Sequence, residues 1–81
     1  MTKAELTNYI SRGNEIEFTY GGKRYSITYN ENDPAHPISF CEFYKETSDV
    51  KDVEELARVQ HEGVTVLEML ESLTEKEIWI F

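Results

Sequence analysis

Apolar and polar residues alternate strictly on both sides of one glycine pair. On either side of Gly21-Gly22 every second position is apolar, namely Ile16, Phe18, Tyr20, Tyr25, Ile27 and Tyr29. A period of two is typical of strands with one buried face, and a glycine pair supplies the positive φ angles of a tight turn. Residues 16–29 therefore predict a β-hairpin with one apolar face.

Two turn lengths keep the apolar side chains of this hairpin together. A two-residue loop pairs Phe18 with Tyr25, whereas a four-residue loop pairs Tyr20 with Tyr25. A three-residue loop would place the two apolar sets on opposite faces, because side chains alternate along a strand. We expect one of the first two registers.

The first helix is predicted over residues 3–12. Thr2 and Glu5 have the spacing of a capping box, in which each side chain bonds a backbone N–H at the helix start. An apolar stripe begins at Leu6, and Gly13 is placed to end the helix in a left-handed conformation. A helix of about three turns is too short to be stable alone, so we expect it to pack on the sheet.

Two further helices are predicted in the second half of the chain. Asp52 is placed to cap a short helix, which a polar break at residues 61–63 separates from the next. Thr65 and Glu68 form the capping box of the last helix, which ends near residues 72–74. Val64 and Met69 have the spacing of a hydrophobic staple at its start, and Leu67, Leu70 and Leu73 continue its predicted buried stripe.

Two more strands are predicted outside the hairpin. Residues 38–45 have apolar side chains on both sides, which favours a central strand covered at least partly on both faces, although Glu42 does not fit the apolar side. Residues 47–52 are a polar connection, and residues 77–81 predict a closing strand at a sheet edge. The expected fold is an α+β two-layer sandwich of order α-β-β-β-α-α-β, with helices on one face of a small, mainly antiparallel sheet of about four strands.

Length and composition indicate one small domain over residues 1–81. The chain has ten aromatic residues and neither a low-complexity stretch nor an internal repeat. No apolar run approaches the roughly 18 residues of a membrane span, and no secretory signal is present. The single cysteine, Cys41, favours a reducing compartment and is interpreted as a small core residue. We therefore expect a cytoplasmic protein.

Negative charge is concentrated in the second half of the chain. Residues 42–81 carry eleven acids and four bases, against five acids and four bases in residues 1–41. Lys23 and Arg24, at the hairpin turn, are interpreted as solubilising residues. Because phosphate backbones and anionic membranes attract clustered Lys and Arg, we expect neither direct nucleic-acid binding nor membrane binding. The charge suits a basic protein partner or simply high solubility.

A row of acids is the first candidate binding site. Glu68, Glu71 and Glu75 recur at i, i+3 and i+7, which places them on one exposed face of a helix. Such a row can imitate spaced phosphates and occupy the basic groove of a nucleic-acid-binding protein or defence enzyme, with binding that weakens as salt rises. It can equally be a solvated face of an acidic protein.

The closing strand is the second candidate site. Trp79 and Phe81 alternate with Ile78 and Ile80, so the two pairs lie on opposite faces. If helices cover both faces, all four residues belong to the core. If one face is open, Trp79 and Phe81 form an apolar patch suited to a protein partner or to a second copy of the chain in a homodimer.

Catalytic and cofactor motifs are absent from the sequence. It has no Gly-rich phosphate loop, no cysteine pair and no nucleophile elbow. The two histidines are near carboxylates, His36 after Asp33 and His61 before Glu62, and Asp33 and His36 could form a metal site with an outside carboxylate. Loop histidines in a chain that is 30% charged usually face solvent. We expect no enzyme activity, no cofactor and no metal.

Three segments resemble small acidic proteins of unassigned function from Gram-positive bacteria and their phages or mobile elements. Residues 16–27 resemble the opening hairpin of those proteins, and residues 52–56 and 63–70 are similar to their two helix starts. The resemblance implies a bacterial or phage accessory protein and no catalytic residue. The sequence thus predicts a non-enzymatic, protein-binding accessory or regulatory domain. Its expected contact residues are Glu68, Glu71, Glu75, Trp79 and Phe81.

Overall fold

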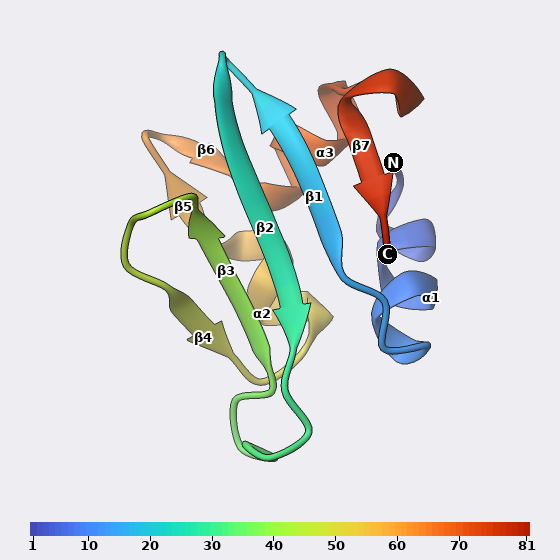
Figure 1. Ribbon diagram of the computed structural model, residues 1–81, viewed down its shortest axis with the longest axis vertical. Helices are drawn as coiled ribbons and strands as arrows, with labels where there is room; N and C mark the ends of the chain where they lie inside the picture. The colour runs from blue at the N-terminus through green and yellow to red at the C-terminus, as the bar shows by residue number, and fades with distance from the viewer.

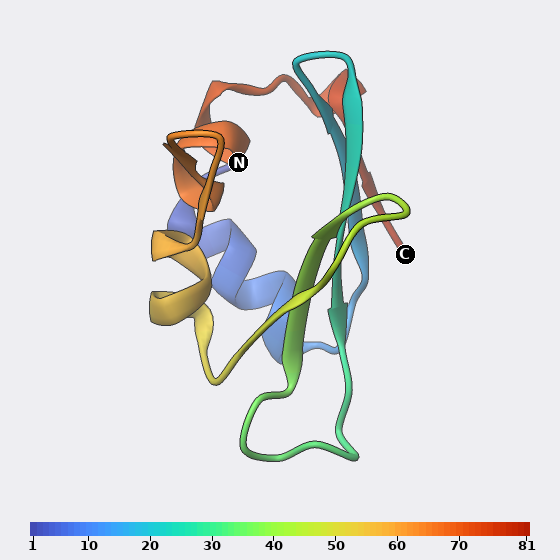
Figure 2. The same ribbon diagram turned by 90° about the vertical axis from the view of Figure 1, so that its left-hand side faces the viewer.

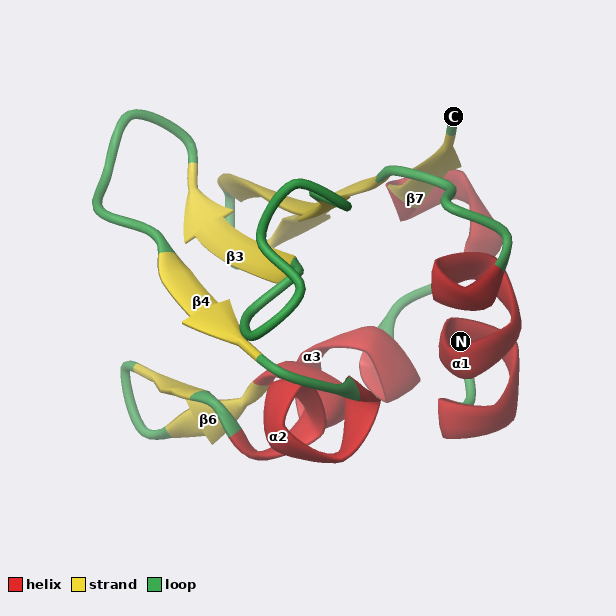
Figure 3. Ribbon diagram, turned by 90° about the horizontal axis from the view of Figure 1, so that it is seen from below, coloured by secondary structure: helices red, strands yellow, loops and turns green.

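The chain folds into two layers, a sheet and a set of helices that covers one face of the sheet. In the computed structural model, which describes residues 1–81, the helices lie behind the sheet in Figure 1 and on one side of it in Figure 2. Seen from below, the other face of the sheet carries no helix (Figure 3). We call this uncovered surface the open face. The predicted α+β sandwich with helices on one face is confirmed.

The helices are α1 (Lys3–Ser11), α2 (Val53–Arg58) and α3 (Val66–Ser72), followed by a 3-10 turn, η1 (Glu75–Glu77). The strands are β1 (Ile16–Tyr20), β2 (Lys23–Tyr29), β3 (Ile38–Glu42), β4 (Ser48–Val50), β5 (Gln60–His61), β6 (Val64–Thr65) and β7 (Ile78–Ile80). The main sheet is antiparallel throughout, in the order β4-β3-β2-β1-β7, and β5 pairs with β6 in a small second sheet. None of the helices is both long enough and apolar enough to cross a bilayer.

The hairpin of β1 and β2 has the shorter of its two predicted loops. Phe18 pairs with Tyr25, so the turn consists of Gly21 and Gly22 alone. Their φ angles are +59° and +78°, a backbone conformation that costs an L residue with a side chain about 1–2 kcal/mol. Two consecutive positive φ angles match the twist of the flanking strands, and the glycine pair therefore fixes the register of the central strands.

Side chains cap the three helices as the sequence predicts. Thr2 and Glu5 form a capping box at α1, and Thr65 and Glu68 form one at α3. Asp52 accepts a bond of 2.9 Å from the Glu55 N–H at the start of α2. Each cap satisfies backbone donors that have no partner inside the helix, so these short helices begin at fixed residues.

A stack of three aromatic rings forms the centre of the core. Phe18, Tyr25 and Phe40 come from β1, β2 and β3, and neighbouring ring centroids are 5.2 Å and 5.7 Å apart. All three rings face the helices and are almost fully buried. The buried helical residues that pack in the same cluster are Leu6, Ile10, Leu56, Val66, Met69 and Leu70.

The structure contains three short strands that the sequence pattern did not predict. The expected polar connection over residues 47–52 contains β4, which pairs with β3 and buries only Val50. The expected polar break at residues 61–63 is the turn between β5 and β6. Strands of two or three residues are too short to show a period of two, so only pairing across the chain defines them.

The strand predicted over residues 38–45 is shorter and less covered than expected. β3 ends at Glu42, and Tyr44 has a φ of +68°, which turns the chain away from the sheet. The prediction of cover on both faces is wrong, because no helix lies over the open face. Cys41 lies half-exposed on that face with its Sγ 3.4 Å from Ser26 Oγ, so it is not a core residue.

The buried stripe of α3 matches the prediction in part, because Met69 and Leu70 are buried as expected and Leu67 is not. Val66, Met69 and Leu70 are buried, whereas Leu67 and Leu73 are half-buried. Val66, Met69 and Leu70 have the i, i+3, i+4 spacing of one helix face, counted from the first residue after the Thr65 cap. Leu67 is one residue, or about 100°, away from Val66 around the helix, and Leu73 lies beyond the helix end.

The one-sided cover of the sheet predicts different effects for two neighbouring methyl deletions on β2. Ile27 is 1% exposed and faces the helices, whereas Thr28 is the next residue and faces the open side. Ile27→Val is expected to lower the free energy of unfolding by about 1 kcal/mol, measured by urea denaturation. Thr28→Ser also loses one methyl group and is expected to change it by less than about 0.5 kcal/mol. Equal losses would show that the open face is covered in solution.

Candidate functional site

Two groups of side chains lie outside the hydrophobic core. The first, the His61 cluster, consists of Lys23, Glu42, His61 and Glu62. It lies where the β5–β6 hairpin meets the sheet. The second, the aromatic–arginine cluster, consists of Arg24, Phe43, Tyr44 and Trp79. It lies on the open face.

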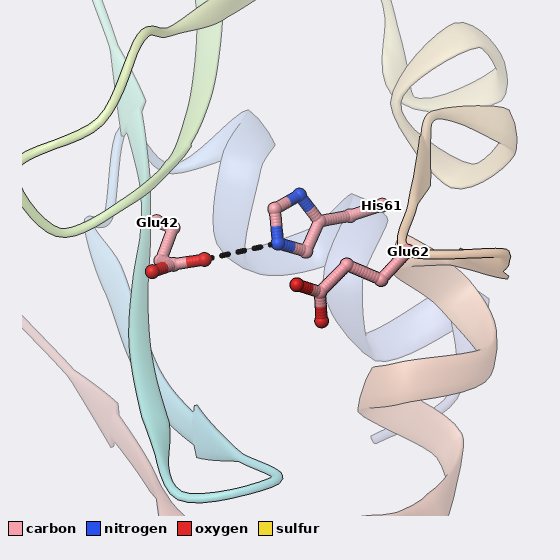
Figure 4. A group of neighbouring side chains, drawn as sticks. All are labelled: Glu42, His61 and Glu62. Carbon is pink, nitrogen blue, oxygen red and sulfur yellow. Dashed lines mark hydrogen bonds and ion pairs between the residues drawn. The ribbon is translucent and has the colours of Figure 1, made fainter.

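The His61 cluster connects the small hairpin to the main sheet through polar bonds. Glu42 is the last residue of β3 and points toward the helix layer, where its Oε1 lies 3.0 Å from His61 Nε2 (Figure 4). Lys23, the first residue of β2, donates to Glu62 Oε1 at 2.7 Å and lies 3.9 Å from Glu42 Oε1. Glu42, the one residue that did not fit the apolar side of β3, therefore joins the β5–β6 hairpin to the main sheet through its bond with His61.

The His61 ring also packs on the aromatic core. Its centroid is 5.2 Å from that of Tyr25 and 6.4 Å from that of Phe40, with the rings nearly perpendicular. This edge-on contact is a favourable aromatic geometry. Burial, and next the nearby Glu42 carboxylate, raise the pKa of Tyr25, so its phenol stays protonated at neutral pH. The ring and its carboxylate partner together close one end of the core.

Lys23 and Glu62 hold each other in the charged state. The hydrogen bond from Lys23 lowers the pKa of Glu62 below 4.5, and the same bond raises the pKa of Lys23 above 10.5. Both side chains are exposed to solvent, so salt screens much of their attraction. This pair is consequently an exposed contact that orients the turn between β5 and β6.

Three side chains of the His61 cluster have the arrangement of possible metal ligands. One ligand atom from each of Glu42, His61 and Glu62 lies within 4.8 Å of the others. Imidazole and carboxylate are ligands that divalent transition metals accept. The Lys23 ammonium, however, is bonded to Glu62 and lies beside Glu42, so it already neutralises the same carboxylates. A metal ion would have to displace Lys23, and the geometry favours an ion-paired contact between two sheets.

The aromatic–arginine cluster is built on Arg24. Its guanidinium carbon lies 5.2 Å from the ring centroid of Phe43 and 5.2 Å from that of Trp79. Arg24 Nη2 also donates to Glu17 Oε1 at 3.1 Å. Glu17 is the cross-strand partner of Trp79 on the open face, so β1, β2 and β7 each contribute one member of this contact. These two cation–π contacts hold the guanidinium in place.

Further exposed aromatics extend this cluster in two directions. Tyr44 is fully exposed and its ring lies edge-on to Phe43, with 6.2 Å between centroids. Phe81, two residues after Trp79, is 63% exposed, and its backbone exchanges two hydrogen bonds with Glu15. Trp79 itself is 42% exposed. The structure therefore decides between the two sequence interpretations of the closing strand, because Trp79 and Phe81 lie on an uncovered face.

The predicted acidic row is divided between two elements. Glu68, Glu71 and Glu75 are all exposed, but α3 ends at Ser72 and Glu75 lies in η1. Glu68 accepts a bond of 3.1 Å from the Thr65 N–H, and this bond lowers its pKa. The three acids thus do not continue along one helix face, because Glu75 lies in the turn that leads into β7.

Neither histidine ring bonds the carboxylate nearest to it in sequence. His36 is exposed, and its backbone N–H bonds Asp33 Oδ1 at 3.2 Å. His61 bonds Glu42, which lies 19 residues away. Sequence reasoning missed the roles of Lys23, Arg24 and Glu42. The alternation in β2 placed Arg24 on the polar face, but its two aromatic neighbours come from distant segments of the chain.

No family model, curated protein or solved structure matches this chain. These comparisons therefore suggest no function for the chain.

The ion pair of the His61 cluster predicts how the pKa of Glu62 responds to a mutation. Lys23→Met removes the donor, so the pKa of Glu62 should rise toward 4.5. This pKa can be measured by NMR of the side-chain carboxyl during an acid titration. The ion pair stabilises the fold above the pKa that Glu62 has in the unfolded chain, and this stabilisation is lost as pH falls through the lower pKa of Glu62 in the folded chain. Lys23→Met should therefore lower the free energy of unfolding mainly above about pH 4.5.

Glu68 is the internal control for this titration. Its pKa is lowered by Thr65, and Lys23→Met should leave it unchanged. A Glu62 pKa that stays low in the variant would show that Lys23 is not its partner in solution.

Proposed function

We propose that this chain is a non-enzymatic accessory domain that binds another protein through the β7 end of its open face. The observation that carries the proposal is the exposed stack of Trp79, Arg24 and Phe43 on a face that no helix covers. Its bacterial or phage origin rests on the sequence resemblance alone.

The composition of the aromatic–arginine cluster supports a protein contact. Trp, Tyr and Arg are the residue types that dominate binding energy at protein interfaces. Here Trp79, Tyr44 and Arg24 belong to one continuous set of contacts, and Phe81 follows two residues after Trp79, just past the end of β7. Large exposed apolar groups that gather in one place usually mark a binding surface, whereas single ones do not.

The cluster is also held in position before any partner arrives. Arg24 is fixed by two rings and by the Glu17 carboxylate, and both Arg24 and Glu17 lie on paired strands. A side chain that is already ordered loses less conformational entropy on binding, so more of its contact energy contributes to affinity. The neighbouring positions on this face are small and polar, such as Ser26, Thr28 and Ser39, as at the rim of an interface.

The geometry supports catalysis less well. An active site needs a pocket that encloses a substrate and groups with suitable pKa values inside it. The two cavities of the structure are lined by other residues, and neither contains a member of the His61 cluster. The acidic phosphate-mimic alternative also has less support, because α3 ends at Ser72 and Glu75 lies outside it, so the three acids do not form one row on a helix face.

Loss of the tryptophan ring should weaken partner binding. Binding partners would be captured from a lysate of the organism that encodes the chain and quantified by mass spectrometry. Trp79→Ala and Arg24→Ala should each reduce capture of the specific partner by about tenfold or more, as expected for central interface residues.

Tyr29→Ala is the matched control for Trp79→Ala. Tyr29 is 44% exposed, close to the 42% of Trp79, but it faces the helix side of β2. Its loss should leave capture unchanged. Equal capture by all variants would contradict the proposal. A partner lost only in Glu71→Lys with Glu75→Lys, and displaced by DNA, would favour phosphate mimicry instead.

A further inference from the structure

The outer edge of β7 has backbone groups without a partner strand. Glu15 and Phe81 exchange both of their backbone bonds, at 3.2 Å and 2.8 Å. Bonded and non-bonded pairs alternate along an antiparallel ladder, so the next pair, Ile16 with Ile80, is non-bonded. The N–H and C=O of Ile80 therefore point away from β1, toward the edge where the sheet ends (Figure 1). The Ile78 N–H, by contrast, already bonds Glu75.

An apolar groove lies directly beside this edge. A cavity of about 290 Å³ is lined by Tyr9 of α1, by Leu73, and by Ile78 and Ile80 of β7. The two β7 residues line it with the side chains that face the helix layer, opposite Trp79. The unpaired backbone edge and the groove thus adjoin each other, with the aromatic–arginine cluster on the other side of the same strand.

The charge around the groove is negative. Glu5 and Glu75 line the cavity, and no lysine or arginine does. Met1 also lines it, and its N-terminal ammonium, which donates to Leu70 O at 2.9 Å, offsets one of the two negative charges. The bond to the Thr2 backbone lowers the pKa of Glu5, so its carboxylate is ionised at neutral pH. An apolar groove with an acidic border favours a ligand that combines apolar side chains with Lys or Arg.

We propose that an extended segment of the partner protein adds to β7 as a sixth strand of the sheet. Its backbone bonds Ile80, and alternate side chains enter the groove or lie beside Trp79 and Phe81, because successive side chains of a strand point to opposite faces. The segment carries apolar residues that fill the groove and Lys or Arg that face Glu5 and Glu75. This inference rests on the proposed function and names the chemistry of its partner.

A second copy of this chain is a poorer occupant of the same edge. Two β7 edges would bring the acidic borders of both grooves together, in a protein with a net charge of −8. Like charges held close together oppose association. A basic partner segment instead gains from the same field, in association rate as well as in affinity.

The test uses a phage-displayed library of random linear peptides, selected against the whole chain. The expected peptides combine apolar residues with Lys or Arg, with side chains of both kinds on the face that enters the groove, and their binding should slow the hydrogen exchange of the Ile80 amide. Ile80→Pro removes the outward N–H and leaves the bonds between β7 and β1 intact, since Ile80 makes none of them. It should weaken peptide binding by about tenfold or more.

Two controls separate the backbone from the side chain. Ile80→Ala shortens the side chain and keeps the N–H, so it should weaken binding clearly less than Ile80→Pro. The second control leaves the protein unchanged: methylating alternate peptide nitrogens should abolish binding for the set that faces β7 and spare the other set. This control decides the question even if Ile80→Pro does not fold.

Three results would overturn the inference, and they differ in what they say of the proposed function. Peptides that resist Ile80→Pro and backbone methylation but are lost with Trp79→Ala would exclude strand addition and leave the open face as the binding surface. A failure to select any peptide while Trp79→Ala still reduces lysate capture would have the same meaning. A dimer in sedimentation that dissociates in Ile80→Pro would assign the edge to a second copy.

Discussion

The two-residue turn at Gly21-Gly22 is the constraint on which the rest of the structure depends. It sets Phe18 opposite Tyr25, and a shift of one residue would turn every apolar side chain of one strand toward solvent. With this register the rings of Phe18, Tyr25 and Phe40 stack under the helices, and the His61 ring packs edge-on against Tyr25 and Phe40. The same register directs Arg24 to the open face, where it meets Trp79.

A chain of this length covers only one face of its sheet. The three helices contain nine, six and seven residues and together form a single layer. The open face is made compatible with water mainly by small polar side chains, and its aromatic residues gather around one arginine. Uneven cover thus produces both the hydrophobic core and the surface that we propose binds a partner.

The acidic character of the chain is divided among separate tasks. Glu5, Asp52 and Glu68 cap helices, and Glu17, Glu54 and Glu62 pair with Arg24, Lys3 and Lys23. Each of these acids is engaged in a separate contact at a different place on the molecule, so a net charge of −8 does not by itself create one acidic binding surface. Glu75 combines with Glu5 at the groove beside β7, where a carboxylate from the start of the chain meets one from near its end.

The sequence by itself determined the elements whose signals are local. The glycine turn, the capping boxes at Thr2 and Thr65 and the alternation in β1 and β2 are set by neighbouring residues, and all are found as predicted. Only the tertiary structure decided which face of the sheet is covered, that β4 and the β5–β6 hairpin exist, and that Glu42 meets His61. These features depend on pairing between distant segments. The burial gained in such pairing cannot be inferred from any short stretch of the sequence.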